Sequence, residues 1–304
     1  MDIPIIRGKV PAPGDGEYGE MKHYASGGAQ SDANVVGGGS AEPWIDVIRK
    51  YEPSAFPATE RLLSDEVLRT RIKGTAIDVG AGTCFLTARI SQLPSVDHVY
   101  AIDMSEEFLT STGARILEHF NAVPGKVTFV ASDFNAIPLP DAFADTAFIF
   151  AAIHHSLSPI KTLQEVARVV KPGGTIFILE NPVSVLKIRQ VRQYFLSLSR
   201  TGNVTEIAYT RRELEYVIDN AKIGDWEAHT WDVLGRPGPR RWIRHLLRAL
   251  RLEDILLNPP TTFSPFAVRR GTYPFSTGFH RKGTGQPAFP LSRCCSLGVM
   301  TAFT

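Results

Sequence analysis

The chain has 304 residues, of which 43% are hydrophobic, with 33 Lys plus Arg against 31 Asp plus Glu. That length can bury a full α/β core with one appended subdomain, and the composition is ordinary for a globular protein. A formal net charge of +2 gives no reason to expect a polyanionic partner. The sequence shows no apolar run long enough for a membrane span and no signal-peptide pattern, so neither is expected.

The three cysteines form neither a disulfide framework nor the spacing of metal ligands. We therefore expect a cytoplasmic protein without a metal site.

Residues 1–40 are rich in glycine and poor in large apolar side chains, which predicts a flexible N-terminal segment. Apolar residues at helical spacing predict a short helix over 44–51 and a second over 59–72, covering the first edge of the fold.

The most informative stretch is 75–86. An apolar run ends at Asp78, the glycines Gly80 and Gly82 follow, and helical spacing begins at Phe85. This pattern predicts a buried strand, a tight turn and a helix start, whose free N–H groups face the crevice above the strand. The third glycine of a dinucleotide site would fall at Phe85, and no Lys-Ser or Lys-Thr pair of a P-loop follows. Taken alone, the stretch also fits an ordinary strand-to-helix turn.

A second apolar strand ends at Asp103, 25 positions beyond Asp78. At about this distance, the second-strand carboxylate of nucleotide-binding α/β folds meets a ribose, and a carboxylate can accept both hydrogen bonds of a vicinal diol. The alternative is that Asp103 only caps a helix or lies in a loop. A third strand over 126–131 leads to Asp133, and a fourth over 145–150 leads to a pair of histidines.

A helix over 163–170 follows, then Lys-Pro-Gly-Gly at 171–174 and an apolar strand at 175–180. This order, together with the Asp-x-Gly-x-Gly turn at 78–82, resembles the class I S-adenosylmethionine-dependent methyltransferases. The resemblance extends over about a hundred residues, to roughly Asn181, and looks nearest to the branch of quinone, sugar and natural-product methyltransferases. One departure is Cys84, where many members have a third glycine.

The resemblance implies an α/β fold with a Rossmann-like, doubly wound, seven-stranded, mostly parallel sheet, N-terminal helices and an inserted helical cap. It also implies S-adenosylmethionine as cofactor and S-adenosylhomocysteine as product. In that family the first-strand acid lies near the amino-acid end of the cofactor, the glycines admit methionine and ribose, and an acid after the third strand recognises adenine with its neighbour. The cofactor contacts implied here are Asp78, Gly80, Ala81, Gly82, Asp103, Met104, Asp133, Phe134 and Ala151.

The methyl group on a sulfonium is already activated, so the enzyme mainly aligns a nucleophile and excludes water. A hydroxyl acceptor benefits from a base, whereas positioning suffices for an amine or an acidic carbon. His154 and His155, after the fourth strand, are the candidate catalytic bases, because imidazole titrates near neutrality. The alternative is that the pair only shapes the site. Glu180 and Asn181 are further candidates for contacting the acceptor.

The predicted organisation is a methyltransferase domain over 41–282, with a cofactor core at 74–182, acceptor-side helices and an insert at 183–262, and a disordered tail at 283–304. The final strand is expected near 272–281.

A basic amphipathic helix at 240–251 could hold an anion or touch a membrane surface, or could simply be solvated.

The predicted function is methyl transfer from S-adenosylmethionine to a hydroxyl or amine of a small molecule. An RNA methyltransferase and a non-catalytic cofactor-binding scaffold are the alternatives, with nucleic acid the less expected partner because aromatic stacking platforms are missing. The acceptor and the oligomeric state stay open.

Overall fold

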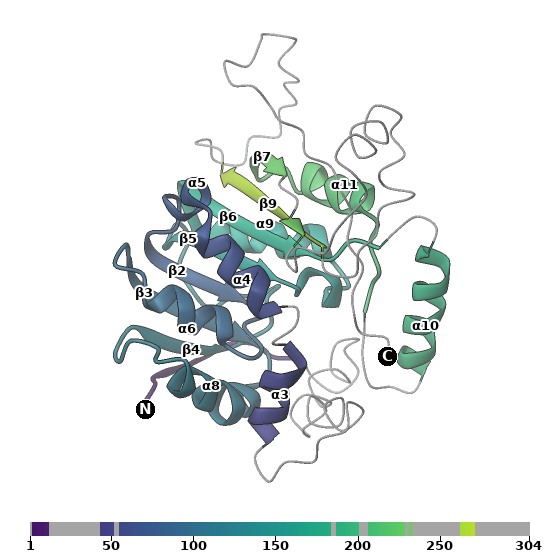
Figure 1. Ribbon diagram of the computed structural model, residues 1–304. Coiled ribbons are helices and arrows are strands. Elements are labelled where there is room, and N and C mark those ends of the chain that lie inside the picture. The colour runs from purple at the N-terminus through teal and green to yellow at the C-terminus, as the bar shows by residue number, and fades with distance from the viewer. Residues whose placement is uncertain are drawn as a thin grey trace.

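The computed structural model describes residues 2–11, 43–51, 55–183, 187–200, 206–228, 231–232 and 262–270. Its centre is a twisted sheet with helices on both faces (Figure 1). The strands are β1 Ile5–Arg7, β2 Gly74–Val79, β3 Val96–Asp103, β4 Val127–Ala131, β5 Ala144–Phe150, β6 Val170–Glu180, β7 Gly224–Ala228, β8 Trp231–Asp232 and β9 Thr262–Arg270. Their order is β1-β4-β3-β2-β5-β6-β9-β7, and β8 pairs with β9.

The sheet is doubly wound, as predicted. From β2 the chain runs through β3 and β4 toward one edge, and from β5 it continues through β6 toward the other, with parallel pairing throughout. Strand β9 lies antiparallel between β6 and β7. The order therefore reverses between β2 and β5, and open parallel sheets bind ligands at the carboxyl ends of the strands at such a switch point.

The strand count differs from the predicted seven. The path from β4 to β7 contains seven strands, and β1 and β8 are additional within the described residues. Strand β9 begins at Thr262, and the range predicted for a final strand, 272–281, lies outside the described residues. The Lys-Pro-Gly-Gly run does not separate α9 (Pro159–Val169) from the next strand, because β6 already begins at Val170 and carries this run as an irregularity in its pairing with β5.

Strand β1 lies in the segment predicted to be flexible. Ile5 pairs with Phe129 and Arg7 with Ala131, in parallel with β4. Ile6 packs against one core cluster, and Ile3 and Ile5 pack against another. Residues 2–11 are therefore part of the sheet, whereas 12–42 lie outside the described residues, as do the basic helix at 240–251 and the tail at 283–304.

The helices are α3 Pro43–Tyr51, α4 Ala55–Ser64, α5 Glu66–Arg69, α6 Phe85–Ser91, α7 Glu106–Phe108, α8 Ala114–His119, α9, α10 Ile188–Arg200 and α11 Arg211–Ala221, with a π turn η1 at Leu109–Gly113 and a 3-10 turn η2 at Ile153–His155. The helix predicted over 59–72 is two helices, because Asp65 caps α5 by accepting the N–H of Leu68. None of the helices in these ranges is long and apolar enough to cross a membrane.

Two apolar layers hold the helices on the sheet. On one face, α4, α5 and α6 contribute Leu62, Leu68 and Leu86 to a cluster that includes Phe148 and Phe177 of β5 and β6. On the other, residues of α9 and α11 pack on the alternate side chains of β2, β5 and β6, a cluster that includes Ile77, Ile149, Leu163, Ile178 and Leu214. Since successive side chains of a strand face opposite layers, Ile77 and Asp78 point to different faces.

Candidate active site

The glycine turn after β2 is built tightly against the neighbouring strands. The N–H groups of Gly80 and Ala81 both donate to the carbonyl of Ile102 at 2.9 Å. Gly80 has φ +71°, and a Cβ there would lie 2.5 Å from the Cβ of Ala152. Gly82 has φ +46°, and the nearest atom to a Cβ there is 3.8 Å away. Gly80 is thus required by its backbone and by its contact with Ala152, whereas Gly82 is required by its backbone alone, because a Cβ there would make only an ordinary van der Waals contact.

Cys84 occupies the N-cap of α6 in the left-handed region, with φ +58°. This backbone explains why a glycine is favourable at the position, since Gly takes positive φ without a steric penalty. The cysteine side chain is fully buried, and a Cβ on Gly113 would lie 2.9 Å from its sulfur. Burial raises the pKa of the thiol well above its ordinary value. Cys84 is therefore a packing residue in a neutral state.

Asp78 is buried beneath α6. Only 2% of it is exposed, and its Oδ2 accepts a hydrogen bond from Oγ1 of Thr87 at 2.6 Å. Burial is the main cause of its raised pKa, about 6 against an ordinary 3.8. This hydrogen bond therefore links β2 to α6.

Asp103 joins the second strand to the glycine turn. Its Oδ2 accepts from the N–H of Gly82 at 2.9 Å, and its Oδ1 accepts from the N–H of Ser105 at 3.0 Å. Met104, half-buried, follows it directly. Asp103 pairs in register with Ala131 of β4, and the N–H of Ser132 donates to the Asp103 carbonyl. The carboxylate is held at the carboxyl end of β3, next to the loop that leaves β4.

That loop carries Asp133 and Phe134. Asp133 Oδ1 accepts from the backbone N–H of Asn135 at 2.7 Å and from its Nδ2 at 3.0 Å. Phe134 is 8% exposed and packs with Ile137 and Leu139 in the core. Among the described residues no acceptor lies opposite the Phe134 N–H. The two acids, Asp103 and Asp133, thus lie at the same edge of the sheet.

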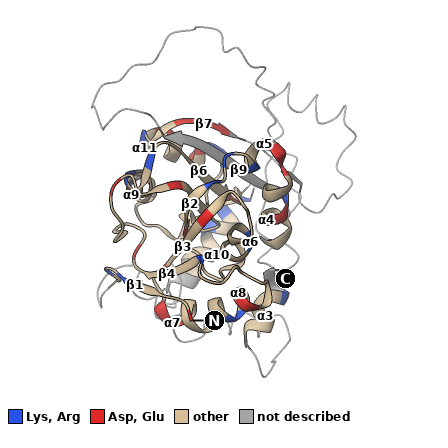
Figure 2. Ribbon diagram, turned by 90° about the vertical axis from the view of Figure 1, so that its left-hand side faces the viewer, with Lys and Arg blue, Asp and Glu red and all other residues tan. Residues whose placement is uncertain are grey.

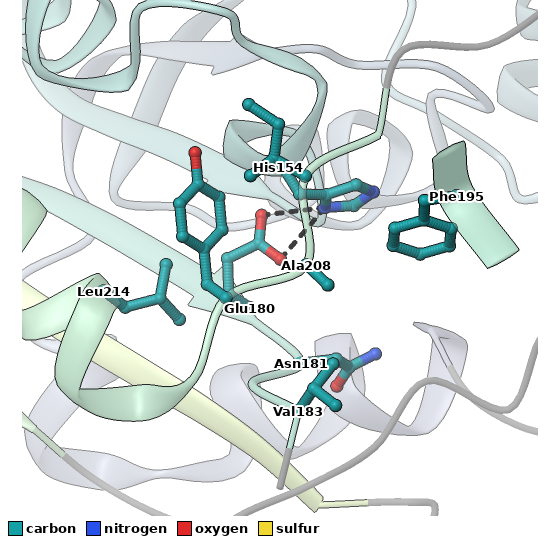
Figure 3. Close-up of a pocket in the computed structure, with 9 residues that line it drawn as sticks. His154, Glu180, Asn181, Val183, Phe195, Ala208 and Leu214 are labelled. Carbon is teal, nitrogen blue, oxygen red and sulfur yellow. Dashed lines mark hydrogen bonds and ion pairs between the residues drawn. The ribbon is translucent and has the colours of Figure 1, made fainter. Parts of the chain in front are cut away.

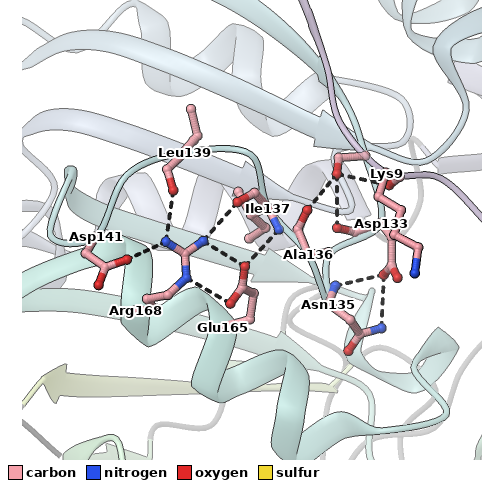
Figure 4. A network of polar contacts seen from close by, with 10 residues as sticks. Lys9, Asp133, Asn135, Ala136, Ile137, Leu139, Asp141, Glu165 and Arg168 are labelled. Carbon is pink, nitrogen blue, oxygen red and sulfur yellow. Dashed lines mark hydrogen bonds and ion pairs between the residues drawn. The ribbon is translucent and has the colours of Figure 1, made fainter.

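Two residues of α9 hold the far end of the loop (Figure 4). Arg168 donates to the carbonyls of Ile137 and Leu139 at 2.9 and 3.0 Å, and Glu165 accepts from the Ile137 N–H at 2.9 Å. Arg168 and Glu165 also bond each other, and this contact with Glu165 is the first cause of the raised pKa of the guanidinium. The loop is therefore fixed by charged groups that satisfy its backbone. No local motif marks this pair in the sequence.

The histidine pair lies just after β5. Ala151 has φ +47° and donates to the carbonyl of Leu179 at 2.8 Å, which turns the chain into η2. The Nδ1 of His154 lies 3.1 Å from Oε2 and 3.2 Å from Oε1 of Glu180 (Figure 3). Oε1 also accepts from the N–H of Ile153 at 3.0 Å. Both His154 and Glu180 are buried, so their contact is shielded from water. The carboxylate fixes the orientation of the imidazole ring.

The ring of His155 lies beside that of His154, with centroids 4.1 Å apart. Glu206 joins them, and one ligand atom of each of these three residues lies within 4.8 Å of the others. The absence of a metal site therefore stays a prediction. Glu206 carries no local motif that would have identified it in the sequence.

A pocket opens beside the His154–Glu180 pair, with room for about one water molecule at about 10 Å³. Figure 3 shows the second ring nitrogen of His154 directed away from Glu180 and toward Phe195 of α10. The pocket is lined by His154, Glu180, Asn181, Val183, Phe195, Ile207, Ala208, Tyr209 and Leu214. Most of these are apolar.

Two buried polar atoms of this lining have no hydrogen-bond partner among the described residues. They are Oδ1 of Asn181 and the hydroxyl of Tyr209. Burial raises the pKa of Tyr209 to about 12, so its hydroxyl stays protonated at neutral pH. A buried polar group without a partner is costly, and a ligand can supply the missing bond.

Comparison with known proteins agrees with this geometry. A family model described as a methyltransferase domain matches residues 77–178. The ubiquinone/menaquinone biosynthesis C-methyltransferase UbiE of Vibrio parahaemolyticus is 30% identical over 112 residues, which are 36% of this chain and 42% of that protein. The chain thus spans less than half of the length of the curated relatives it matches.

Two solved structures share the fold. The DhpI–SAH complex aligns with a TM-score of 0.52 at 17% identity, covering 86% of this chain and 100% of that one. Phosphoethanolamine N-methyltransferase 2 of Haemonchus contortus, solved with phosphomonomethylethanolamine and S-adenosylhomocysteine, aligns with a TM-score of 0.53 at 14% identity, covering 77% of this chain and 61% of that one. The strand order and the glycine turn after β2 agree with the matched family model. Residues 77–178 thus match a methyltransferase domain, and over this stretch the chain is similar to class I S-adenosylmethionine-dependent methyltransferases.

Proposed function

We propose that the protein transfers the methyl group of S-adenosylmethionine to a small molecule whose acceptor group is an ionisable hydroxyl or the carbon activated by it. The observation that carries the acceptor half is the contact between His154 Nδ1 and the Glu180 carboxylate. The proposed cofactor is supported by the match to a methyltransferase domain. It is also supported by the hydrogen bonds that order the glycine turn after β2 and the loop after β4. Within this proposal, 74–182 is the cofactor core, and 183–262 belongs to the acceptor side.

In the cofactor half, Asp103 is the proposed ribose ligand. Each carboxylate oxygen has lone pairs beyond the one that accepts from Gly82 or Ser105, so the group can still accept from a diol. Gly82 lets the ligand lie against the backbone. Adenine is proposed to contact the Asp133 carboxylate and the N–H of Phe134. The remaining proposed contacts are Asp78, Gly80, Ala81, Met104 and Ala151.

In the acceptor half, His154 is the proposed base. If its Nδ1–H donates to Glu180, then Nε2 is the nitrogen that carries a lone pair, and this nitrogen points away from the carboxylate (Figure 3). Ala152, two residues earlier, packs against Gly80. The proposed base thus comes from the same turn that borders the cofactor crevice. His155 is proposed to shape the site rather than to move a proton.

The chemistry narrows the acceptor. Nε2 takes the hydroxyl proton, the oxyanion or its neighbouring carbon attacks the methyl group, and the carbon–sulfur electron pair leaves with S-adenosylhomocysteine. When this neighbouring carbon is the atom that is methylated, it then loses its own proton. A neutral amine already has a lone pair and gains less from a base, so the His–Glu pair favours a hydroxyl over an amine. An ionised enol or phenol reacts at oxygen or carbon, which is compatible with relatives named C-methyltransferases.

The pocket supports a partly apolar acceptor. Val183, Phe195 and Leu214 provide apolar walls, and the unpartnered Asn181 and Tyr209 atoms provide an acceptor and a donor. A space of about 10 Å³ is too small for a substrate, so this pocket is the inner end of the acceptor site, and α10 must shift when an acceptor enters.

The test is a transfer assay with methyl-labelled S-adenosylmethionine. The purified chain is incubated with separate panels of phenols and enols, small amines, and RNA, and products are identified by mass spectrometry. We expect label on the hydroxyl-bearing panel, with fragmentation distinguishing oxygen from carbon. Label on RNA alone would favour the RNA methyltransferase. Binding of S-adenosylhomocysteine without transfer to any panel would favour the scaffold.

A further inference from the structure

We propose that the backbone from Pro4 to Lys9, here called the N-terminal arm, positions the loop that recognises adenine and thereby sets the affinity and selectivity for the adenine ring. This inference rests on the proposed function, because it takes Asp133 and Phe134 as the adenine contacts. Nothing in the local sequence pattern marks the arm as part of a ligand site, but its hydrogen bonds connect it to this loop.

The pairing of the arm with β4 continues beyond the strand. The N–H of Phe129 donates to the Pro4 carbonyl at 2.9 Å, and the N–H of Gly8 donates to the Ala131 carbonyl at 2.9 Å. The N–H of Asp133 then donates to the Lys9 carbonyl at 2.7 Å. Because β1 and β4 are parallel, their carboxyl ends lie at the same edge of the sheet. The arm therefore reaches the adenine loop with its last residue.

Ser132 adds a second link. Its Oγ lies 3.1 Å from the Lys9 carbonyl and 3.0 Å from the Ala136 carbonyl, and the residue is almost fully buried. The arm and the turn after Asp133 thus share one hydroxyl. Without Lys9, the Asp133 N–H and the Ser132 hydroxyl would each lose an acceptor, and the Asp133 end of the loop would keep only its bonds within the loop and to Asp103 and Thr162.

The arm and α9 hold different backbone groups of the loop. Residues of α9 fix Ile137 and Leu139, whereas the arm fixes Asp133. Perturbing the arm should therefore loosen the adenine contacts without releasing the rest of the loop. Lys9 acts through Asp133 and is a positioning residue.

Gly8 is the point at which the arm can be tested most precisely by substitution. A Cβ on Gly8 would lie 2.5 Å from Ser132 Oγ and 2.7 Å from Pro138 Cγ. A side chain at this position must push the arm away from the loop, so Gly8→Ala disturbs the packing of the arm on Ser132 and Pro138. Arg7 offers a matched control. It bonds Glu106 of α7 at 2.8 and 2.6 Å, and exposed ion pairs contribute little. Figure 2 shows β1 and α7, the elements that carry these two residues, on the same side of the molecule.

The experiment measures the Kd of S-adenosylhomocysteine and of its inosine analogue by calorimetry, well below each variant's unfolding midpoint. The inosine analogue replaces the amino group that Asp133 would accept from. The wild type should bind it at least about tenfold more weakly than the adenine compound, the size expected for losing a hydrogen bond to a charged group. The variants are Gly8→Ala, a deletion of residues 2–9, and Arg7→Ala.

We expect the deletion and Gly8→Ala to weaken binding of S-adenosylhomocysteine by about tenfold and to reduce its preference over the inosine analogue to about twofold. Arg7→Ala should stay within about twofold of the wild type in both respects. Unchanged preference in the two arm variants would overturn the inference, whether or not affinity falls, because a purely structural role would not alter selectivity. A wild-type protein that ignores S-adenosylhomocysteine would instead overturn the proposed function on which the inference depends.

Discussion

The Nδ1 of His154 lies 3.1 Å from Oε2 of Glu180, although the two residues are 26 positions apart in the chain. They meet because β5 and β6 are adjacent and parallel, so that η2 and the end of β6 lie at one edge of the sheet. The same carboxylate also holds the N–H of Ile153, which fixes the turn that carries the imidazole. The pair is thus oriented by contacts within the protein.

The first prediction concerns this pair. His154→Gln should lower kcat by about 10² to 10⁴-fold, the usual contribution of a general base, with little change in the Kd of S-adenosylhomocysteine. Glu180→Gln should lower kcat in the same direction by losing the orienting carboxylate. His155→Gln is the matched control from the same turn and should keep most of the turnover. Near-wild-type turnover in His154→Gln, with cofactor binding intact, would remove the base assignment.

The second prediction concerns Gly80. Gly80→Ala should destabilise the fold by about 1–3 kcal/mol for positive φ, with a further cost for the contact with Ala152. Gly125→Ala is the control, because Gly125 has φ +79° and nothing lies within 4 Å of its Cβ position. Denaturant unfolding should show a larger loss for Gly80→Ala than for Gly125→Ala. Adding Ala152→Gly should restore only the contact part, and equal losses at both glycines would contradict the close approach.

The third prediction follows from Asp78. Its pKa is raised by burial from an ordinary 3.8 to about 6, so the fold favours the protonated carboxyl. The stabilising contribution of this group is fully present below about pH 4 and is lost as the pH rises through about 6, a change on the order of 3 kcal/mol. The free energy of unfolding, measured from pH 3 to 8 for the wild type and Asp78→Asn, should differ by this amount across that window. A pH-independent difference would show that Asp78 titrates normally.

The fourth prediction concerns metal ions. Treatment with a chelator should leave methyl transfer unchanged, because the proposed mechanism uses His154 as a base oriented by Glu180. The cluster of His154, His155 and Glu206 makes this worth measuring, since a carboxylate behind a histidine is also usual in metal sites. Loss of turnover on chelation, restored by added Zn²⁺ or Mn²⁺, would replace the base with a metal ligand.

The sheet core was predictable because its signals are local. The apolar runs before Asp78 and Asp103 and the two glycines between them are each visible within a few residues, and parallel pairing then brings the strand ends together. The third strand over 126–131 is visible in the same way, and the resemblance added the expected adenine role of the loop that follows it. Periodicity and turn chemistry therefore sufficed for the order of elements from β2 to β6.

The features that were missed depend on distant pairs of residues. Strand β1 has only three residues, and its partner β4 lies more than 120 positions away, so no periodic pattern announces it. Arg168 and Glu165 look like an ordinary ion pair on a helix, and only the folded chain shows that they bind the carbonyls and N–H of a loop. Glu180 was predicted only to contact the methyl acceptor. Its contact with His154 was not predicted, because the two residues are far apart in the sequence.

Strand β1 has one more consequence, for how the protein behaves in solution. It covers the hydrogen-bonding side of β4, which would otherwise present unpaired N–H and carbonyl groups along an outer strand. A chain shortened at its beginning would offer that strand as a template to a second molecule. Self-association that grows with protein concentration is therefore expected of the shortened chain and not of Gly8→Ala, and light scattering can distinguish the two.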